Sequence, residues 1–157
     1  MTSVAPSVRS ILVALDESER APLVFATGVT MARGLGAQLF LIRVLVIPPD
    51  IPPAAHTHPD RLEASIERDA RADLRTLMEA HPGVEYVPSI VIVAGDPWRN
   101  TLDTAKTFDV DLIVVGSRRH HGPVDRVLGT VAARVVNHAD RNVLVVHEKG
   151  ADRDTVS

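Results

Sequence analysis

The chain alternates between two patterns of apolar residues, and each pattern predicts a different kind of element. Short, nearly continuous apolar runs are typical of strands buried on both faces of a parallel sheet. In the segments between them, apolar residues recur every three or four positions, as on the buried face of a helix. We therefore expect strands over residues 10–15, 38–47 and 86–93, in the run that ends at Gly116-Ser117, and over 143–146.

Residues that start and stop helices mark the ends of the first two helical segments. Asp16 or Ser18 is the expected N-cap of the first helix, which is predicted to end in the segment Gly34-Leu-Gly36. The second helix is predicted over about residues 60–80 and stops at the His-Pro-Gly turn that follows. One face of this helix is dense in Arg, Glu and Asp, which is typical of a solvated surface.

Two further helices complete an alternating order of strands and helices. The third begins at Gly95-Asp96-Pro97, where the aspartate is the expected N-cap, and runs to about Phe108. The fourth runs from Gly129-Thr130 to His138. The order β-α-β-α-β-α-β-α-β predicts an α/β fold with a doubly wound parallel sheet and right-handed crossovers. Within that sheet, Pro88 favours an edge position for the third strand.

Length, charge and composition narrow the class of protein. The 157 residues suffice for one domain, which we expect over residues 1–150, followed by a polar tail over 151–157. A net charge of −3 and a pI of about 6.1 give no basis for a nucleic-acid or membrane-surface partner. The absence of cysteine excludes disulfides, thiolate metal ligands and thiol catalysis. With no leader-like start and no apolar run near the roughly 20 residues that span a bilayer, we expect a cytoplasmic protein.

The most informative stretch joins a buried strand to a helix through small residues. Gly116-Ser117 ends the strand, and Gly129-Thr130 follows at the start of the fourth helix. Backbone N–H groups of Thr130 and Val131, together with the positive end of the helix dipole, can hold a phosphate there. Asp16 follows the first strand, at the end where open α/β sheets bind ligands. In the alternative without a ligand, Gly116 simply ends its strand, Thr130 caps its helix and Asp16 is an N-cap.

Together these features resemble the universal stress protein family. The shared pieces are the order of elements, a first strand ending in Asp16, Gly95-Asp-Pro97, Asp111-Leu-Ile-Val-Val-Gly-Ser, and Asn142-Val-Leu-Val-Val after the last helix. The resemblance implies a five-stranded sheet of order 3-2-1-4-5 with helices on both faces, usually in a homodimer. It also implies one of two classes, of which one binds ATP or AMP and the other binds no nucleotide.

The glycine motif of the nucleotide-binding class fits this chain at three of its four positions. The motif falls on Gly116, Arg119, Gly129 and Thr130, so Arg119 is the departure. If the backbone there needs a positive φ, a non-glycine residue adds strain of about 1 kcal/mol, and its side chain can crowd the phosphates. Arg118 and Arg119 can equally supply charge, because guanidinium groups pair bidentately with phosphate.

The resemblance also assigns the remaining contacts of an ATP or AMP ligand. Asp16 would lie on the ribose side or hold a water-bridged Mg²⁺, and the backbone of Val44 would meet the adenine. The complete set of expected contacts is Ala14, Asp16, Val44, Val115, Gly116, Ser117, Arg118, Arg119, Gly129, Thr130 and Val131.

Two functions of different classes remain open. The first is a non-catalytic, nucleotide-binding regulator of the stress response that acts as a homodimer. The second, which Arg119 and the bulk of His121 favour, is a dimer that binds no nucleotide and acts through protein partners. We expect no catalytic residue, because the chain has neither a Gly-x-Ser-x-Gly elbow nor a Walker A motif; slow, incidental ATP hydrolysis is a third alternative. We also expect no metal site. In both leading cases the strand 143–146 is expected to pair antiparallel with its copy in a second chain, since a bare apolar edge invites aggregation.

Overall fold

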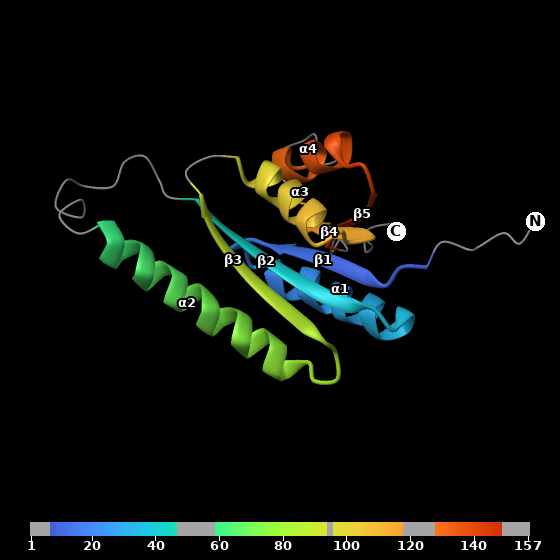
Figure 1. Cartoon of the computed structure of the whole chain (residues 1–157), viewed down its shortest axis with the longest axis horizontal. Helices are drawn as coiled ribbons and strands as arrows, with labels where there is room; N and C mark the ends of the chain where they lie inside the picture. The colour runs from blue at the N-terminus through green and yellow to red at the C-terminus, as the bar shows by residue number, and fades with distance from the viewer. Residues whose placement is uncertain (1–6, 47–58, 94–95, 118–127, 149–157) are drawn as a thin grey trace, which may run out of the picture.

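A single parallel sheet forms the centre of the computed structural model, which describes residues 7–46, 59–93, 96–117 and 128–148 (Figure 1). Its five strands have the order β3-β2-β1-β4-β5, and each neighbouring pair is parallel. The strands are β1 (Ser10–Leu15), β2 (Gln38–Val46), β3 (Tyr86–Val93), β4 (Leu112–Gly116) and β5 (Asn142–Val146). The predicted fold class and strand order are confirmed, and β3, which contains Pro88, is an edge strand as expected.

Helices cover both faces of the sheet (Figure 1). In the described ranges, α1 (Ala21–Leu35) and α2 (Pro59–Ala80) lie on one face, and α3 (Pro97–Thr107) and α4 (Thr130–His138) lie on the other. Because successive side chains of a strand point to opposite faces, the strands contribute to both buried clusters. Val13 of β1 packs with α1, whereas its neighbour Leu12 packs with α3 and α4. Among these helices, none combines the length and the apolar character that crossing a membrane requires.

Helix α1 lies very close to the central strand. A Cβ atom added to Gly28 would stand 2.4 Å from a methyl carbon of Val13, so only glycine allows this approach. The helix ends as predicted at Gly36, whose φ of 64° is the left-handed conformation that glycine adopts readily. This close packing fixes the direction in which the chain leaves β1, and so helps to position the site described below.

The expected N-cap of α1 is wrong, because the helix begins later than Asp16 or Ser18. Arg20 occupies the N-cap position and caps no backbone N–H with its side chain. Asp16 Oδ1 instead accepts hydrogen bonds from the backbone N–H and the hydroxyl of Ser18, and the Ser18 hydroxyl accepts one from the N–H of Arg20. The polar residues after β1 therefore form a local turn, which competes with helix capping for the same side chains. Asp96 does occupy the N-cap of α3, also without a side-chain cap.

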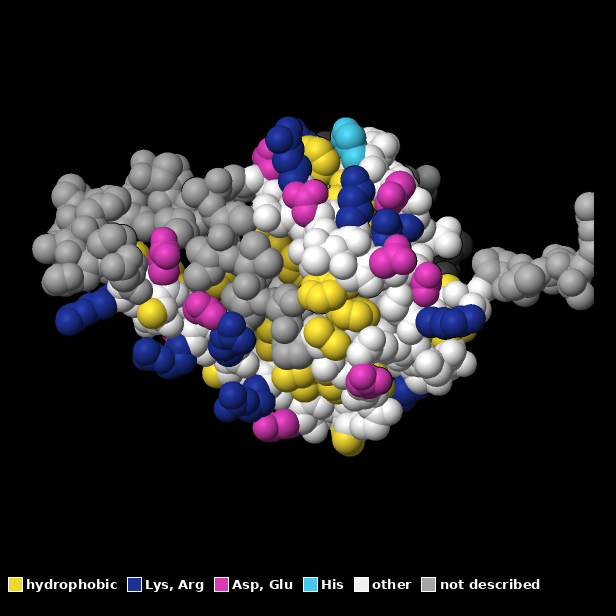
Figure 2. All heavy atoms as spheres, viewed as in Figure 1, with side chains coloured by type: hydrophobic (Ala, Val, Ile, Leu, Met, Phe, Trp, Pro, Cys, Tyr) yellow, Lys and Arg dark blue, Asp and Glu magenta, His cyan; other side chains and the backbone are white. Residues whose placement is uncertain are grey.

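Helix α2 presents a charged surface on the side away from the sheet. Exposed arginines alternate with exposed acids along it, and both charge signs are visible on this side of the molecule (Figure 2). Toward the sheet, Ala70 and Leu74 are buried, and Arg43 of β2 pairs with Asp73 at 3.5 Å. The interpretation of the charged face as a solvated surface agrees with this arrangement.

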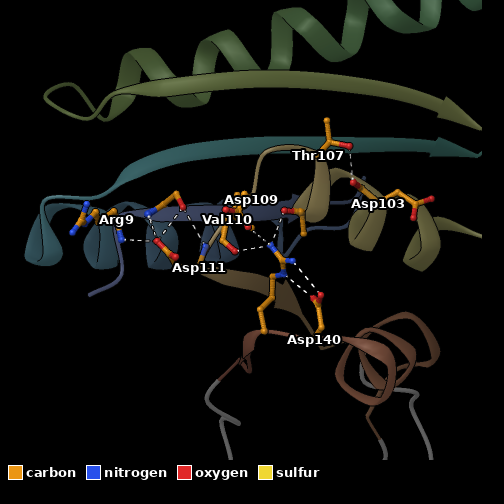
Figure 3. A network of polar contacts seen from close by, with 10 residues as sticks. Arg9, Asp103, Thr107, Asp109, Val110, Asp111 and Asp140 are labelled. Carbon is orange, nitrogen blue, oxygen red and sulfur yellow. Dashed lines mark hydrogen bonds and ion pairs between the residues drawn. The ribbon is translucent and has the colours of Figure 1, made fainter. Parts of the chain in front are cut away.

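Polar contacts join the amino ends of β1, β4 and β5. The carboxylate of Asp111 accepts hydrogen bonds from the backbone N–H groups of Arg9 and Ser10 and from the Ser10 hydroxyl (Figure 3). Arg141 donates through Nη1 to the carbonyl oxygens of Ala105 and Val110, each at 2.8 Å. The same guanidinium pairs with Asp140. The start of each of these three strands is thus held to a neighbouring segment.

We predict that Asp111→Asn lowers the stability of the fold in a pH-dependent way. The hydrogen bond from the Arg9 backbone N–H, and secondarily those from Ser10, lower the pKa of Asp111 in the folded chain. The carboxylate therefore stabilises the fold fully above its unfolded pKa of roughly 4, and this contribution is lost as the pH falls through the lower folded pKa. We expect a loss of about 1–2 kcal/mol near neutral pH that shrinks toward about pH 3.

Urea unfolding of both proteins across this pH range measures the effect. Asp103→Asn, an exposed substitution on α3, controls for the loss of one negative charge. A difference between Asp111→Asn and the unsubstituted protein that stays constant down to the lowest pH would contradict the assignment.

Candidate functional site

A pocket opens at the carboxyl ends of β1 and β4, beside the amino ends of α1 and α4. Its volume is about 400 Å³, which suits a small-molecule ligand. The chain leaves β1 toward α1 on one face of the sheet, and α4, which follows β4, covers the opposite face. Open α/β sheets bind ligands where neighbouring connections diverge in this way.

Each of the expected contact residues that lies within the described ranges lines this pocket. They are Ala14, Asp16, Val44, Val115, Gly116, Ser117, Gly129, Thr130 and Val131. Arg118 and Arg119 lie outside the described residues. The structure thus brings together residues from three strands, the turn after β1 and the start of α4, although their contact with a nucleotide stays a prediction.

One wall of the pocket is apolar. Ala14 and Val115 are register partners in the β1–β4 pair, and Val44 comes from the adjacent strand β2. All three pack with the cluster of side chains beneath α3 and α4, so they lie on the same face of the sheet. Such a wall suits a flat, weakly polar group such as a heteroaromatic ring.

A second part of the pocket lining is built from small residues and main chain. Ser117 is only 3% exposed, and its backbone N–H donates to the carbonyl of Val146 at 3.0 Å. Helix α4 begins at Thr130 after Gly129, and no side chain of the described residues caps it. The first N–H groups of a helix have no partner within it, so those of α4 are donors for an anion. The alternative role of Thr130 as a cap is wrong, because Thr130 is the first helical residue.

Gly116 and Gly129 are glycines for different reasons. A Cβ on Gly116 would stand 2.8 Å from a methyl carbon of Val24 in α1, so close packing of the helix on β4 requires its small size. Gly129 has φ −55° and ψ 151°, a conformation open to any residue. Its side of the pocket would be filled by a larger side chain without strain in the backbone.

Arg20 and Thr101 also line the pocket, although neither is expected there from the sequence. Thr101 is buried in α3, and its hydroxyl donates to the carbonyl of Pro97 at 3.0 Å. Arg20 donates through Nη1 to the carbonyl of Ser117 and lies with Nε 3.4 Å from Glu148. No motif marks either residue. The place of Arg20 in the pocket follows only from the late start of α1, which turns its side chain back over the strand ends.

Within the described part of the chain, acidic and histidine side chains do not gather into a metal centre. In the ranges that the structure covers, no three His, Asp or Glu residues are close enough to hold a metal ion. Asp16 is the carboxylate best placed beside the polar wall, and its Oδ1 is engaged by Ser18. A single carboxylate is compatible with Mg²⁺ only where a ligand phosphate and water complete the coordination.

The fold and the pocket define a class: a doubly wound α/β domain with a ligand site at the point where its crossovers diverge. The model of the universal stress protein family matches residues 7–147, and the chain belongs to this family. Universal stress protein A homolog 1 from Coxiella burnetii is 30% identical over 145 residues, which cover 90% of this chain and 97% of that protein.

Solved structures of related proteins share the fold. The universal stress protein UspA from Lactobacillus plantarum has a TM-score of 0.71 and 27% sequence identity, and the match covers 91% of this chain and all of that one (100%). A universal stress protein from Archaeoglobus fulgidus, solved in complex with dAMP, has a TM-score of 0.62 and 21% identity, with 88% of this chain and 98% of that chain covered. At that identity the second likeness establishes the fold alone.

We predict that Gly116→Ala destabilises the protein through α1 rather than through the pocket. The added methyl group meets Val24, and overpacking of this kind lowers the free energy of unfolding by about 1–3 kcal/mol. Combining it with Val24→Ala, which removes the obstructing methyl groups, should reduce the loss caused by Gly116→Ala. Urea unfolding of the two single variants and the double variant measures this coupling. Strictly additive losses would show that Val24 is not the obstacle.

Proposed function

We propose that the protein is a non-catalytic regulator of the stress response that binds an adenine nucleotide, ATP or AMP, in this pocket. The observation that carries the proposal is the pairing of two unlike walls. The apolar wall of Ala14, Val44 and Val115 suits the adenine, and the start of α4 offers main-chain donors to a phosphate. The complex of the Archaeoglobus fulgidus relative with dAMP supports the same ligand class.

Mg²⁺ fits this proposal as part of the ligand. Phosphate groups that approach the start of α4 also approach Asp16, whose negative charge opposes them. A Mg²⁺ ion bound to the phosphates would shield that repulsion, with Asp16 holding it directly or through water. A base positioned beside the phosphates is not part of the proposal, and turnover is expected to be incidental.

The proposed assembly is a homodimer formed through β5. This strand is at the end of the sheet, and Val143, Leu144 and Val145 are only partly buried within one chain. The carbonyl of Val146 points toward β4, where it accepts the N–H of Ser117. Because peptide groups alternate along a strand, those of Val145 and Val143 face the open edge, ready to pair with a second copy.

We expect ATP with Mg²⁺, or AMP, to bind saturably with micromolar affinity in a calorimetric titration. Gly129→Val should weaken this binding, because the isopropyl group occupies space beside the first N–H groups of α4 while the backbone conformation tolerates it. Gly34→Ala, in open space on α1, is the matched control and should leave binding unchanged. No heat up to about 1 mM, which means an affinity weaker than roughly −4 kcal/mol, would favour the alternative of a dimer that acts through protein partners alone.

The dimer has its own test. Light scattering at micromolar concentration should give about twice the chain mass of 17.0 kDa. Val143→Pro removes one N–H from the open edge while keeping an apolar side chain, so it should give a folded monomer. Circular dichroism checks that the variant is folded. A monomeric unsubstituted protein, or a dimer that survives Val143→Pro, would count against pairing through β5.

A further inference from the structure

Arg20 stands between the pocket and the chain that follows β5. Its side chain is 19% exposed and lines the pocket beside the end of β4. Nη1 donates to the carbonyl of Ser117, and Nε lies 3.4 Å from the carboxylate of Glu148. Ser117 in turn donates its N–H to the carbonyl of Val146, the last residue of β5. One guanidinium group therefore contacts both the strand end that borders the ligand site and the segment beyond the proposed dimer strand.

The charges around the pocket single out this residue. Of the lining residues that the structure describes, Asp16 and Glu17 are acidic and Arg20 is the one cation. A guanidinium group has donors on three nitrogens and pairs with phosphate in a fixed geometry. The hydrogen bond to Ser117 engages Nη1, whereas the ion pair with Glu148 lies at Nε. Arg20 can thus meet an anion without giving up its hydrogen bond to Ser117.

The contact with Glu148 is the one that a ligand would replace. The Glu148 side chain is 62% exposed, and ion pairs of this kind contribute little because water and salt screen them. A phosphate group carries more charge than a carboxylate and would lie in the less exposed pocket, so it competes well for the same guanidinium.

On the basis of the proposed function, we propose that Arg20 recognises the phosphate of the nucleotide and exchanges Glu148 for it. Binding then frees Arg20 from its ion pair with Glu148, and an intact Arg20–Glu148 pair opposes binding. Because coupling between two sites is reciprocal, whatever favours the Arg20–Glu148 pair weakens the nucleotide complex by the same factor.

The test is a calorimetric titration of the full chain with AMP and, separately, with adenosine, which lacks the phosphate. Arg20→Ala should weaken AMP binding by about tenfold and leave adenosine binding unchanged. Arg20→Lys keeps the charge but not the planar fork, so its affinity for AMP should lie between those of the unsubstituted protein and Arg20→Ala. Arg33→Ala is the matched control: it removes the same charge and one side-chain hydrogen bond to a carbonyl, that of Pro82, in the last turn of the same helix.

Glu148→Gln tests the exchange itself. It should tighten AMP binding by about twofold to fivefold, the range that a screened ion pair supports. In the Arg20→Ala background the same substitution should have no effect, since no guanidinium is left to release. Thermal unfolding of each variant checks that it folds. If Arg20→Ala does not fold, the AMP affinities of Arg20→Lys and Glu148→Gln decide whether Arg20 binds the phosphate.

Each other outcome overturns the inference at a recognisable point. Equal losses for AMP and adenosine in Arg20→Ala would make Arg20 a structural residue. Tighter AMP binding by Glu148→Gln in both backgrounds would indicate long-range repulsion instead of exchange. AMP binding that is unaffected by Arg20→Ala would remove the role of Arg20 and leave the nucleotide site standing. An unsubstituted protein that binds neither AMP nor adenosine would overturn the proposed function, and this inference with it.

Discussion

The parallel pairing of β1 with a strand on each side is the constraint on which the other features depend. β2 pairs with one edge of β1 and β4 with the other, so each connection must cross back over a face of the sheet. The helix after β1 covers one face, and the helix after β4 covers the opposite face. Segments that part in opposite directions cannot fill the space between them, and the pocket lies at that point.

The two ends of the sheet differ in how their polar groups are satisfied. At the amino ends of the strands, Asp111 and Arg141 provide partners for main-chain N–H and carbonyl groups. At the carboxyl ends, α4 begins without a side-chain cap and Asp16 turns back on its own loop. Among the described residues, side chains thus hold main-chain groups together at the amino ends of the strands, whereas the pocket lies at the carboxyl ends. The end that holds the pocket keeps donors and charge available to a ligand.

Much of this architecture could be predicted from the sequence, because buried strands and amphipathic helices have distinct periodicities. The bounds of β1 and β3 match the expected ranges, and α1 ends at the expected glycine. The predicted N-cap of α1 was wrong because Asp16 and Ser18 hydrogen-bond to each other. A pattern of capping residues does not distinguish a local turn from a helix cap. Arg20 was missed for a related reason, since its place in the pocket follows from where the helix begins.

The site residues could be gathered from the sequence only through a resemblance, and the two motif glycines show what such a motif contains. At Gly116 the constraint comes from Val24, a residue of α1 that is remote in sequence and has no part in the motif. At Gly129 the backbone imposes no constraint, so the small residue matters only if something occupies the space beside it. A glycine motif thus combines a packing requirement with a ligand requirement, and only the second bears on binding.

The same reasoning applies to a cation: Arg20 reaches the pocket from outside the motif, so the charge that an anionic ligand needs does not have to come from motif positions. The altered motif of this chain is therefore an incomplete guide to its ligand, and the walls of the pocket are the better one.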